Sequence, residues 1–215
     1  MPLQNRIDPW GQFHAHPSRI STRMGNRGIL HDGDNKIVRP WAHKGWVSCL
    51  MSFNGIERKP FSAGHYSELF FLDEATAFAA GHRPCSYCQR TRSHEFRDAW
   101  LEANVADSAA RESMRLPDID KALHIERAMR GGGKVTFDAP IFELSVGTIF
   151  EYEDSAYLLT SRGALPWSFG GYGAPQAINN ELRVRVLTPR SIVNAFRLGF
   201  LPIMHESAGD ASAAP

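Results

Sequence analysis

The chain has 215 residues, 43% of them hydrophobic, which is enough for one ordinary core or two small ones. No apolar run is long enough to span a bilayer, and the first residues lack the apolar region of a signal peptide, so we expect no membrane partner. Three cysteines, an odd number, argue against a disulfide framework and fit a reducing, cytoplasmic environment. The net charge of +1 does not by itself indicate a nucleic-acid ligand.

The distribution of charge says more than its sum. Residues 1–62 contain nine Lys and Arg against four acids, a local excess of 9 − 4 = +5. Basic residues thus gather in the half of the chain that also holds the cysteines. This pattern fits a surface that faces phosphates, and it equally fits an ordinary solvated basic face.

The segment Arg23–Asp32, RMGNRGILHD, stands out in the first part of the chain. Gly25 and Gly28 allow positive φ and a close approach of the backbone to a partner, so we predict a loop. A loop that presents Arg27 and His31 beside free backbone N–H groups would suit a phosphate or another anion. A plain turn with surface arginines is the alternative.

Residues 46–53 are apolar on both sides of the pleat and predict a central strand. Cys49 lies inside it, where a lone cysteine usually acts as a small hydrophobic residue. Asn54 and Gly55 predict a hairpin turn that leads into residues 56–61.

Residues 70–90 combine a helix, a glycine stop and a pair of thiols. Asp73 begins an alanine-rich helix, and Gly81 is its expected end. Cys85 and Cys88 follow on a turn, and two thiols at this spacing can bind one metal ion from the same concavity. Two ordinary buried thiols and a redox-active pair are the alternatives.

The stretch ATAFAAGHRPCSYCQR, residues 75–90, resembles the second half of the Ada-type zinc-binding module. In that family four cysteines hold zinc and the module contacts the DNA backbone. The resemblance therefore implies a zinc ion, a DNA partner and a role in DNA repair. Cys85 and Cys88 match the second cysteine pair of the family. The first pair has no counterpart in this chain, so the methyl transfer known in some members is not implied.

Two more ligands are needed to complete a tetrahedral zinc site. Cys49 is the remaining thiol, and His65 lies just before the helix, so we expect a site of Cys49, His65, Cys85 and Cys88. His94 is the reserve ligand. His82 replaces an aromatic residue of the Ada-type modules, which favours a packing role.

The rest of the chain predicts an α+β fold: a β-rich N-terminal part with the zinc knuckle, central helices, and a small β-rich C-terminal part closed by a helix. We expect a zinc-binding part over 1–104, a linker or helix extension over 105–118, a small α+β part over 119–206 and a disordered tail over 207–215, although one compact domain is also compatible. Helices are predicted over 91–104 and 119–129 and from Thr188 onward, and strands over 135–137, 149–153, 156–160 and 182–187. The aromatic run Leu165–Gly173 suits either a platform for stacked bases or the lid of a small barrel.

Two hypotheses on function follow. The first is a nucleic-acid-binding protein, with DNA as the expected ligand, in which structural zinc supports a basic surface. Its phosphate contacts would come from Arg23, Arg27, Arg83, Arg90 and Arg92.

The second hypothesis is an enzyme, a nuclease or another hydrolase acting on an anionic substrate. Arg27 would bind the substrate and His31 would act as general base, in a pocket between the two halves. Pro84-Cys85-x-x-Cys88 also matches the second half of the zinc deaminase motif, but no His-x-Glu precedes it, and in His65-Tyr-Ser-Glu68 the spacing is one residue too long.

Overall fold

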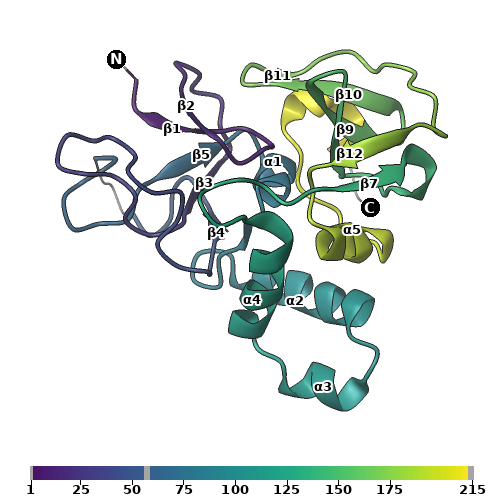
Figure 1. The fold of residues 1–215 in the computed structure, drawn as a ribbon, viewed down its shortest axis with the longest axis horizontal. Helices are drawn as coiled ribbons and strands as arrows, with labels where there is room; N and C mark the ends of the chain where they lie inside the picture. The colour runs from purple at the N-terminus through teal and green to yellow at the C-terminus, as the bar shows by residue number, and fades with distance from the viewer. Residues whose placement is uncertain (1, 56–58, 213–215) are drawn as a thin grey trace.

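The computed structural model describes residues 2–55 and 59–212, and it confirms the predicted α+β class. Two six-stranded sheets lie side by side, and three helices extend from the lower end of the molecule in Figure 1. The first sheet is mixed and uses the N-terminal strands, whereas the second is antiparallel and uses the C-terminal strands. Among the described helices, none is long and apolar enough to cross a membrane.

The N-terminal sheet has the strand order β2-β1-β5-β3-β4-β6. Its strands are β1 (Gln4–Ile7), β2 (Phe13–Ala15), β3 (Arg23–Asn26), β4 (Val47–Cys49), β5 (Leu69–Phe71) and β6 (Arg83–Pro84).

The strand β3 corrects the loop that the glycines predicted. It pairs with both β4 and β5 at the centre of the sheet. A Cβ on Gly25 would lie 2.5 Å from the carbonyl oxygen of Val47, so this glycine permits close strand packing rather than a turn. The strand predicted over 46–53 is reduced to β4, and Asn54 and Gly55 follow with positive φ, as a tight turn requires. Of the next predicted run, 56–61, residues 56–58 lie outside the described residues.

The C-terminal sheet has the order β11-β10-β9-β8-β12-β7. Its strands are β7 (Phe137–Pro140), β8 (Ile149–Tyr152), β9 (Ser155–Thr160), β10 (Gly163–Ser168), β11 (Gly171–Tyr172) and β12 (Arg183–Val186). Short 3₁₀ helices cover Ile141–Glu143 and Glu206–Ser212. The β8–β9 hairpin turns through Glu153 and Asp154, both with positive φ.

Four of the five described helices lie where the sequence predicts a helix, whereas one falls in the segment expected as a linker or helix extension. They are α1 (Glu74–Ala79), α2 (Arg90–Asn104), α3 (Ser108–Ser113), α4 (Leu116–Arg127) and α5 (Arg190–Arg197). Phe96, Trp100 and Leu101 of α2 are buried and pack with α4 and α5 in one cluster. The segment 105–118 forms α3 and the start of α4.

Helix α1 lies at the centre of the molecule, and all six of its residues are buried (Figure 1). Ala77 packs on the N-terminal sheet, Ala75 and Ala79 pack against residues of the C-terminal sheet, and Phe78 packs against the helices. Small side chains on all sides allow both sheets to approach one helix.

In the aromatic run 165–173, Leu165 and Tyr172 are buried in the core and the half-buried Trp167 packs against it. The indole N–H of Trp167 donates to Thr76 Oγ1 (3.0 Å), and the hydroxyl of Tyr172 donates to Asp73 Oδ2 (2.9 Å). These contacts join the run to α1 and to the residue that caps it. The predicted disorder from residue 207 does not hold at its start, because Ser207 Oγ accepts from the backbone N–H of Tyr172 (2.9 Å) and Ala208 is fully buried.

Candidate metal centre

Strand pairing brings the three cysteines together. β6 runs parallel to β4, with Val47 opposite Arg83 and Ser48 opposite Pro84, so the next positions on the two strands are Cys49 and Cys85. The backbone N–H of Cys85 continues this ladder by donating to the carbonyl of Ser48 (2.8 Å). A separation of 36 residues in sequence is thus closed by two short strands.

The loop between β6 and α2 adds the third thiol. The backbone N–H of Gln89 donates to the carbonyl of Cys85 (3.0 Å), which closes a turn over residues 85–89. The side-chain amide of Gln89 donates to the carbonyl of Ser48 (2.9 Å) and ties this turn to β4. α2 begins immediately afterwards at Arg90, so Cys88 is fixed between a strand and a helix.

The three sulfur atoms lie within 4.8 Å of one another. Cys49 is buried, whereas Cys85 and Cys88 are partly exposed, and none forms a disulfide. Three thiols converging at this distance can act together on one metal ion. In the described part of the chain, they are the one group of His, Cys, Asp and Glu side chains arranged in this way.

Hydrogen bonds among the three thiols shift their pKa values in opposite directions. The hydrogen bonds that Cys49 makes to Cys85 and Cys88, together with burial, raise the pKa of Cys49. The hydrogen bond with Cys49 is the main cause that lowers the pKa of Cys85 to about 5, and the backbone N–H groups of Cys88 and Tyr87 act in the same direction. The Cys49 hydrogen bond also lowers the pKa of Cys88. Hydrogen bonds that favour the thiolate form of Cys85 give a favourable starting state for a soft cation.

The cysteines open onto a cavity of about 290 Å³ on the outer face of the N-terminal sheet, which we call the thiol cavity. Met24, Phe70 and Tyr87 contribute to its largely apolar walls. Glu68 also lines it and is buried. Its Oε2 accepts from the backbone N–H of Phe61 (2.9 Å), whereas Oε1 is buried with no hydrogen-bond partner among the described residues. A carboxylate oxygen left in this state needs a proton, a cation or a ligand.

The structure does not bring the predicted histidine ligands to the sulfur atoms. His65 is exposed on a turn, where its backbone N–H donates to the carbonyl of Ser62 (3.1 Å), and it is not part of the thiol group. The reserve ligand His94 is exposed on α2 and is also outside the group. His82 is fully buried and packs on Trp46 and Phe71, in line with its predicted packing role.

Two arginines predicted to contact phosphates have internal partners instead. Arg83 is buried and forms a bidentate pair with Asp120, Nε to Oδ1 at 2.9 Å and Nη2 to Oδ2 at 2.7 Å. Arg92 donates to both carboxylate oxygens of the buried Glu74 (3.2 and 2.9 Å). These partners argue against a phosphate contact at either residue. Arg83 fixes α4 to β6, and Arg92 fixes α2 to α1.

The other three arginines predicted to contact phosphates differ in their exposure. Arg90 is exposed at the start of α2, next to Cys88. Arg23 is half-buried and donates to the carbonyl of Thr22 (3.0 Å). Arg27 is only 2% exposed, so it cannot contribute to an external basic surface.

The predicted catalytic pair is separated. Arg27 lines a cavity whose lining does not include His31. His31 is buried, with Nδ1 2.6 Å from Ser67 Oγ and its ring stacked on Phe61 at a centroid distance of 4.6 Å. These contacts position the loop after β3 and leave His31 no role as a general base in a pocket with Arg27. Glu68 lies immediately before β5, two residues from Phe70, and the sequence alone does not indicate that both line this cavity.

Comparison of the chain with protein-family models, with curated proteins and with solved structures finds no match. The function must therefore be inferred from the geometry of the site.

Proposed function

We propose that the protein binds Zn²⁺ through Cys49, Cys85 and Cys88, and that the zinc-supported N-terminal half binds nucleic acid. The convergence of the three thiols carries the zinc part of the proposal. Thiolates select soft or borderline cations, and a cluster of three fits a tetrahedral ion with one further ligand. Bound zinc would join β4 to the start of α2 and so stabilise an edge of the sheet made of very short strands.

The nucleic-acid part has narrower support. The resemblance of residues 75–90 to a DNA-contacting zinc module points to the surface around Cys88, where Arg90 is exposed. Cations on such a surface would contact the phosphate backbone and release counterions, without reading the base sequence.

Metal analysis and a mobility-shift titration test the two parts separately. We expect about one zinc per chain in the purified protein and loss of that zinc in Cys85→Ser. Arg90→Ala should weaken binding to DNA and reduce the slope of log K against log salt concentration by about one.

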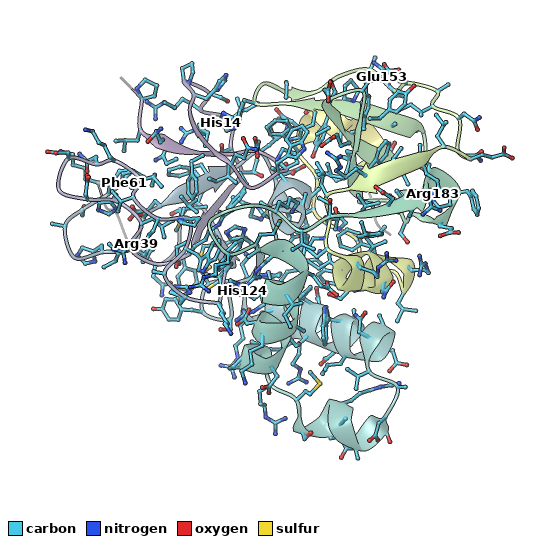
Figure 2. The ribbon with its side chains drawn as sticks, viewed as in Figure 1. His14, Arg39, Phe61, His124, Glu153 and Arg183 are labelled. Atoms are coloured by element: carbon cyan, nitrogen blue, oxygen red, sulfur yellow. The ribbon has the colours of Figure 1, made fainter. Side chains whose placement is uncertain are left out.

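Arg183→Ala is the matched control, because it removes the same charge from an exposed site on the C-terminal sheet, on the opposite side of the molecule from Arg39 and Phe61 (Figure 2). A salt slope that is the same in Arg90→Ala and in the parent protein would count against the nucleic-acid surface. A metal-free parent protein would count against the zinc site.

One observation favours a second candidate function, a zinc hydrolase. The orphaned Oε1 of Glu68 lies in the same cavity as the thiols. Zinc held by three protein ligands supplies Lewis-acid chemistry at its remaining position. Glu68 would accept a proton at Oε1 from a molecule in the cavity, and the apolar walls would limit access of bulk water.

Cobalt substitution distinguishes a closed structural site from an open one. In the hydrolase, small anions such as azide or cyanate should enter the free position and shift the visible spectrum of the Co²⁺ protein. Glu68→Gln should keep the metal but change the pH dependence of that spectrum. A spectrum that neither anions nor pH alters would indicate a closed site and exclude this candidate.

A further inference from the structure

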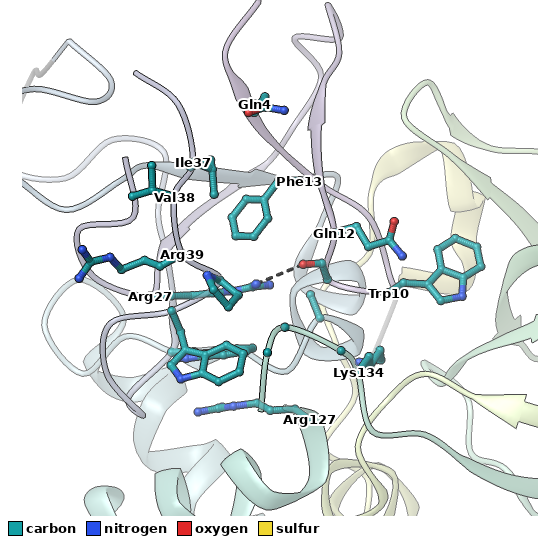
Figure 3. A pocket seen from close by; sticks show the side chains of 18 residues that line it. Gln4, Trp10, Gln12, Phe13, Arg27, Ile37, Val38, Arg39, Arg127 and Lys134 are labelled. Atoms are coloured by element: carbon teal, nitrogen blue, oxygen red, sulfur yellow. Dashed lines mark hydrogen bonds between the residues drawn. The ribbon is translucent and has the colours of Figure 1, made fainter. Parts of the chain in front are cut away.

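A second cavity, of about 410 Å³, has a lining that shares no residue with the thiol cavity. It forms where the β1–β2 turn, the segment 37–46, the end of α4 and the glycines 131–133 meet (Figure 3). Its volume is in the range of small-molecule sites in proteins. We call it the cationic cavity because of the side chains described next.

Four cationic side chains line this cavity: Arg27, Arg39, Arg127 and Lys134. The described residues that line it include no Asp or Glu. Arg27 and Arg127 are each only 2% exposed. Arg27 directly follows β3, and Arg127 is the last residue of α4. The fold therefore places two buried guanidinium groups at one site. Buried charges of one sign are costly unless a counter-charge joins them.

The nearby acids do not neutralise these cations fully. Asp8 exerts an attraction on Arg27 and Lys134, but its oxygens already accept from the backbone N–H of Gln12 (2.8 Å) and lie 2.7 Å from His14 Nε2. Asp120 is bound by Arg83. The cavity therefore has an excess of positive charge inside the protein.

Backbone carbonyls orient the cations but leave hydrogen-bonding capacity free. Arg27 donates through Nη1 to the carbonyl of Gly11 (3.1 Å), while its buried Nη2 has no hydrogen-bond partner among the described residues. Arg127 donates to the carbonyls of Gly81 and Lys44, and its buried Nε likewise lacks a partner in the described part of the chain. Lys134 Nζ donates to the carbonyl of Ala79. Figure 3 shows Arg27, Arg127 and Lys134 around one space.

Aromatic rings form much of the remaining wall. The guanidinium carbon of Arg27 lies 4.2 Å from the ring centroid of Trp46, and that of Arg127 lies 4.4 Å from it. Trp10, Trp41 and Phe13 also line the cavity. Rings beside fixed cations provide a surface for a planar ligand group next to a place for its negative charge.

We propose that the cationic cavity binds a nucleoside monophosphate, with the phosphate at Arg27, Arg127 and Lys134 and the base against the tryptophans. A dianionic phosphate supplies the missing counter-charge and accepts from several donors at once, which a single carboxylate does less completely. The ligand is either a free nucleotide or the phosphorylated end of a single strand. The strand-end form rests on the proposed nucleic-acid binding, whereas the free form is independent of it, and neither form involves the thiols.

Calorimetric titration of the full-length, zinc-loaded protein tests the proposal. The probes are adenosine 5′-monophosphate, adenosine, inorganic phosphate, and a short single strand with and without a 5′-phosphate. We expect the monophosphate to bind at least about tenfold more tightly than either adenosine or inorganic phosphate, because each lacks half of the contacts. A preference for the phosphorylated strand over the free nucleotide identifies the strand end as the source, and the reverse identifies the free nucleotide.

Variants locate the site. Lys134→Met and Arg27→Met should each weaken binding by about tenfold or more. Arg130→Met is the matched control, because Arg130 is exposed beside the same loop and does not line the cavity. Lys134 is only partly buried, so its variant tests the site even if Arg27→Met does not fold.

The proposal is overturned if the monophosphate binds no better than adenosine or inorganic phosphate, in both free and strand-end form. It is also overturned if Lys134→Met binds as tightly as Arg130→Met. Loss of zinc binding in a cysteine variant would leave these results unchanged, so failure of the zinc proposal and failure of this one are distinguishable.

Discussion

The two cavities of the N-terminal half have opposite electrostatic requirements. The thiol cavity gathers three sulfur atoms and an orphaned carboxylate oxygen in apolar surroundings, which favours a cation. The cationic cavity gathers four positive side chains among aromatic rings, which favours an anion. One segment connects them, because the carbonyls of Ala79 and Gly81 hold cations of the second cavity and Cys85 belongs to the first. In each cavity, a bound ligand would satisfy the unpaired groups and so stabilise the folded protein.

Removal of the metal should produce the largest change. At a free zinc concentration of about a thousand times the Kd, zinc adds about 4 kcal/mol to the free energy of unfolding. Cys85→Ser should lose this gain, and Ser86→Ala, an exposed change on the same loop, should keep it. Protons compete with zinc for the thiolates, so zinc should be released as the pH falls. Thermal unfolding with and without a chelator measures the effect, and equal midpoints would contradict it.

The paired arginine gives the next largest effect. Arg83→Met leaves Asp120 buried without its partner and should lower the free energy of unfolding by about 3–5 kcal/mol. Urea unfolding measures this loss. The double variant Arg83→Met with Asp120→Leu should recover much of it, since no unpaired charge then remains. A single variant as stable as the parent protein would show that the ion pair does not hold α4 to β6.

Arg27 donates to His82 and Gly11 but has no carboxylate partner among the described residues, so its substitution should have the opposite effect on stability. Arg27→Met removes a buried cation that repels Arg127, and without ligand it should raise the free energy of unfolding by about 1 kcal/mol. Urea unfolding of Arg27→Met and of Arg83→Met, measured side by side, distinguishes a cation that binds a ligand from one that stabilises the fold. If both variants were destabilised equally, the charges of the cationic cavity would be part of the fold rather than a response to a ligand.

The smallest effect is a pH dependence at Lys134. Burial lowers the pKa of Lys134 to about 7, Arg27 and Arg127 lower it further, and Asp8 acts in the opposite direction. Because the unfolded chain keeps this proton to a higher pH, the folded state gains stability as the pH rises above about 7. We expect about 1 kcal/mol, since the Lys134 residue is only partly buried. Lys134→Met should abolish this rise, and an unchanged pH profile in that variant would assign it to other groups.

The sequence predicts the described helices except α3, and the strands β8, β9 and β12, because their patterns are local. A capping aspartate and Gly81 bound α1, and apolar periodicity marks α2, α4 and α5. The sequence predicts a loop in place of β3, because glycines allow a turn. Gly25 is instead required by the close approach of Val47, which becomes its neighbour only in the folded sheet. A steric requirement of this kind is not visible in one segment.

The candidate site shows the same limit. The spacing of Cys85 and Cys88 predicts a shared site, and Cys49 joins them through strand pairing that the sequence does not specify. Arg127 and Lys134 lie about a hundred residues from Arg27, so their convergence depends on tertiary structure. The glycines 131–133 line the cationic cavity beside Lys134, a placement that the local sequence does not indicate. The sequence also does not show which arginines form ion pairs with buried carboxylates, as Arg83 and Arg92 do.

Trp46 lies between two guanidinium groups, and three of the five tryptophans of the chain line the cationic cavity. The emission of an indole ring depends strongly on the charge and polarity around it. Filling the space beside these rings, or neutralising the flanking cations, should therefore change the intrinsic fluorescence of the unlabelled protein. The molecule carries its own optical reporter of occupancy, suited to screening a panel of anions before any single one is chosen for calorimetry.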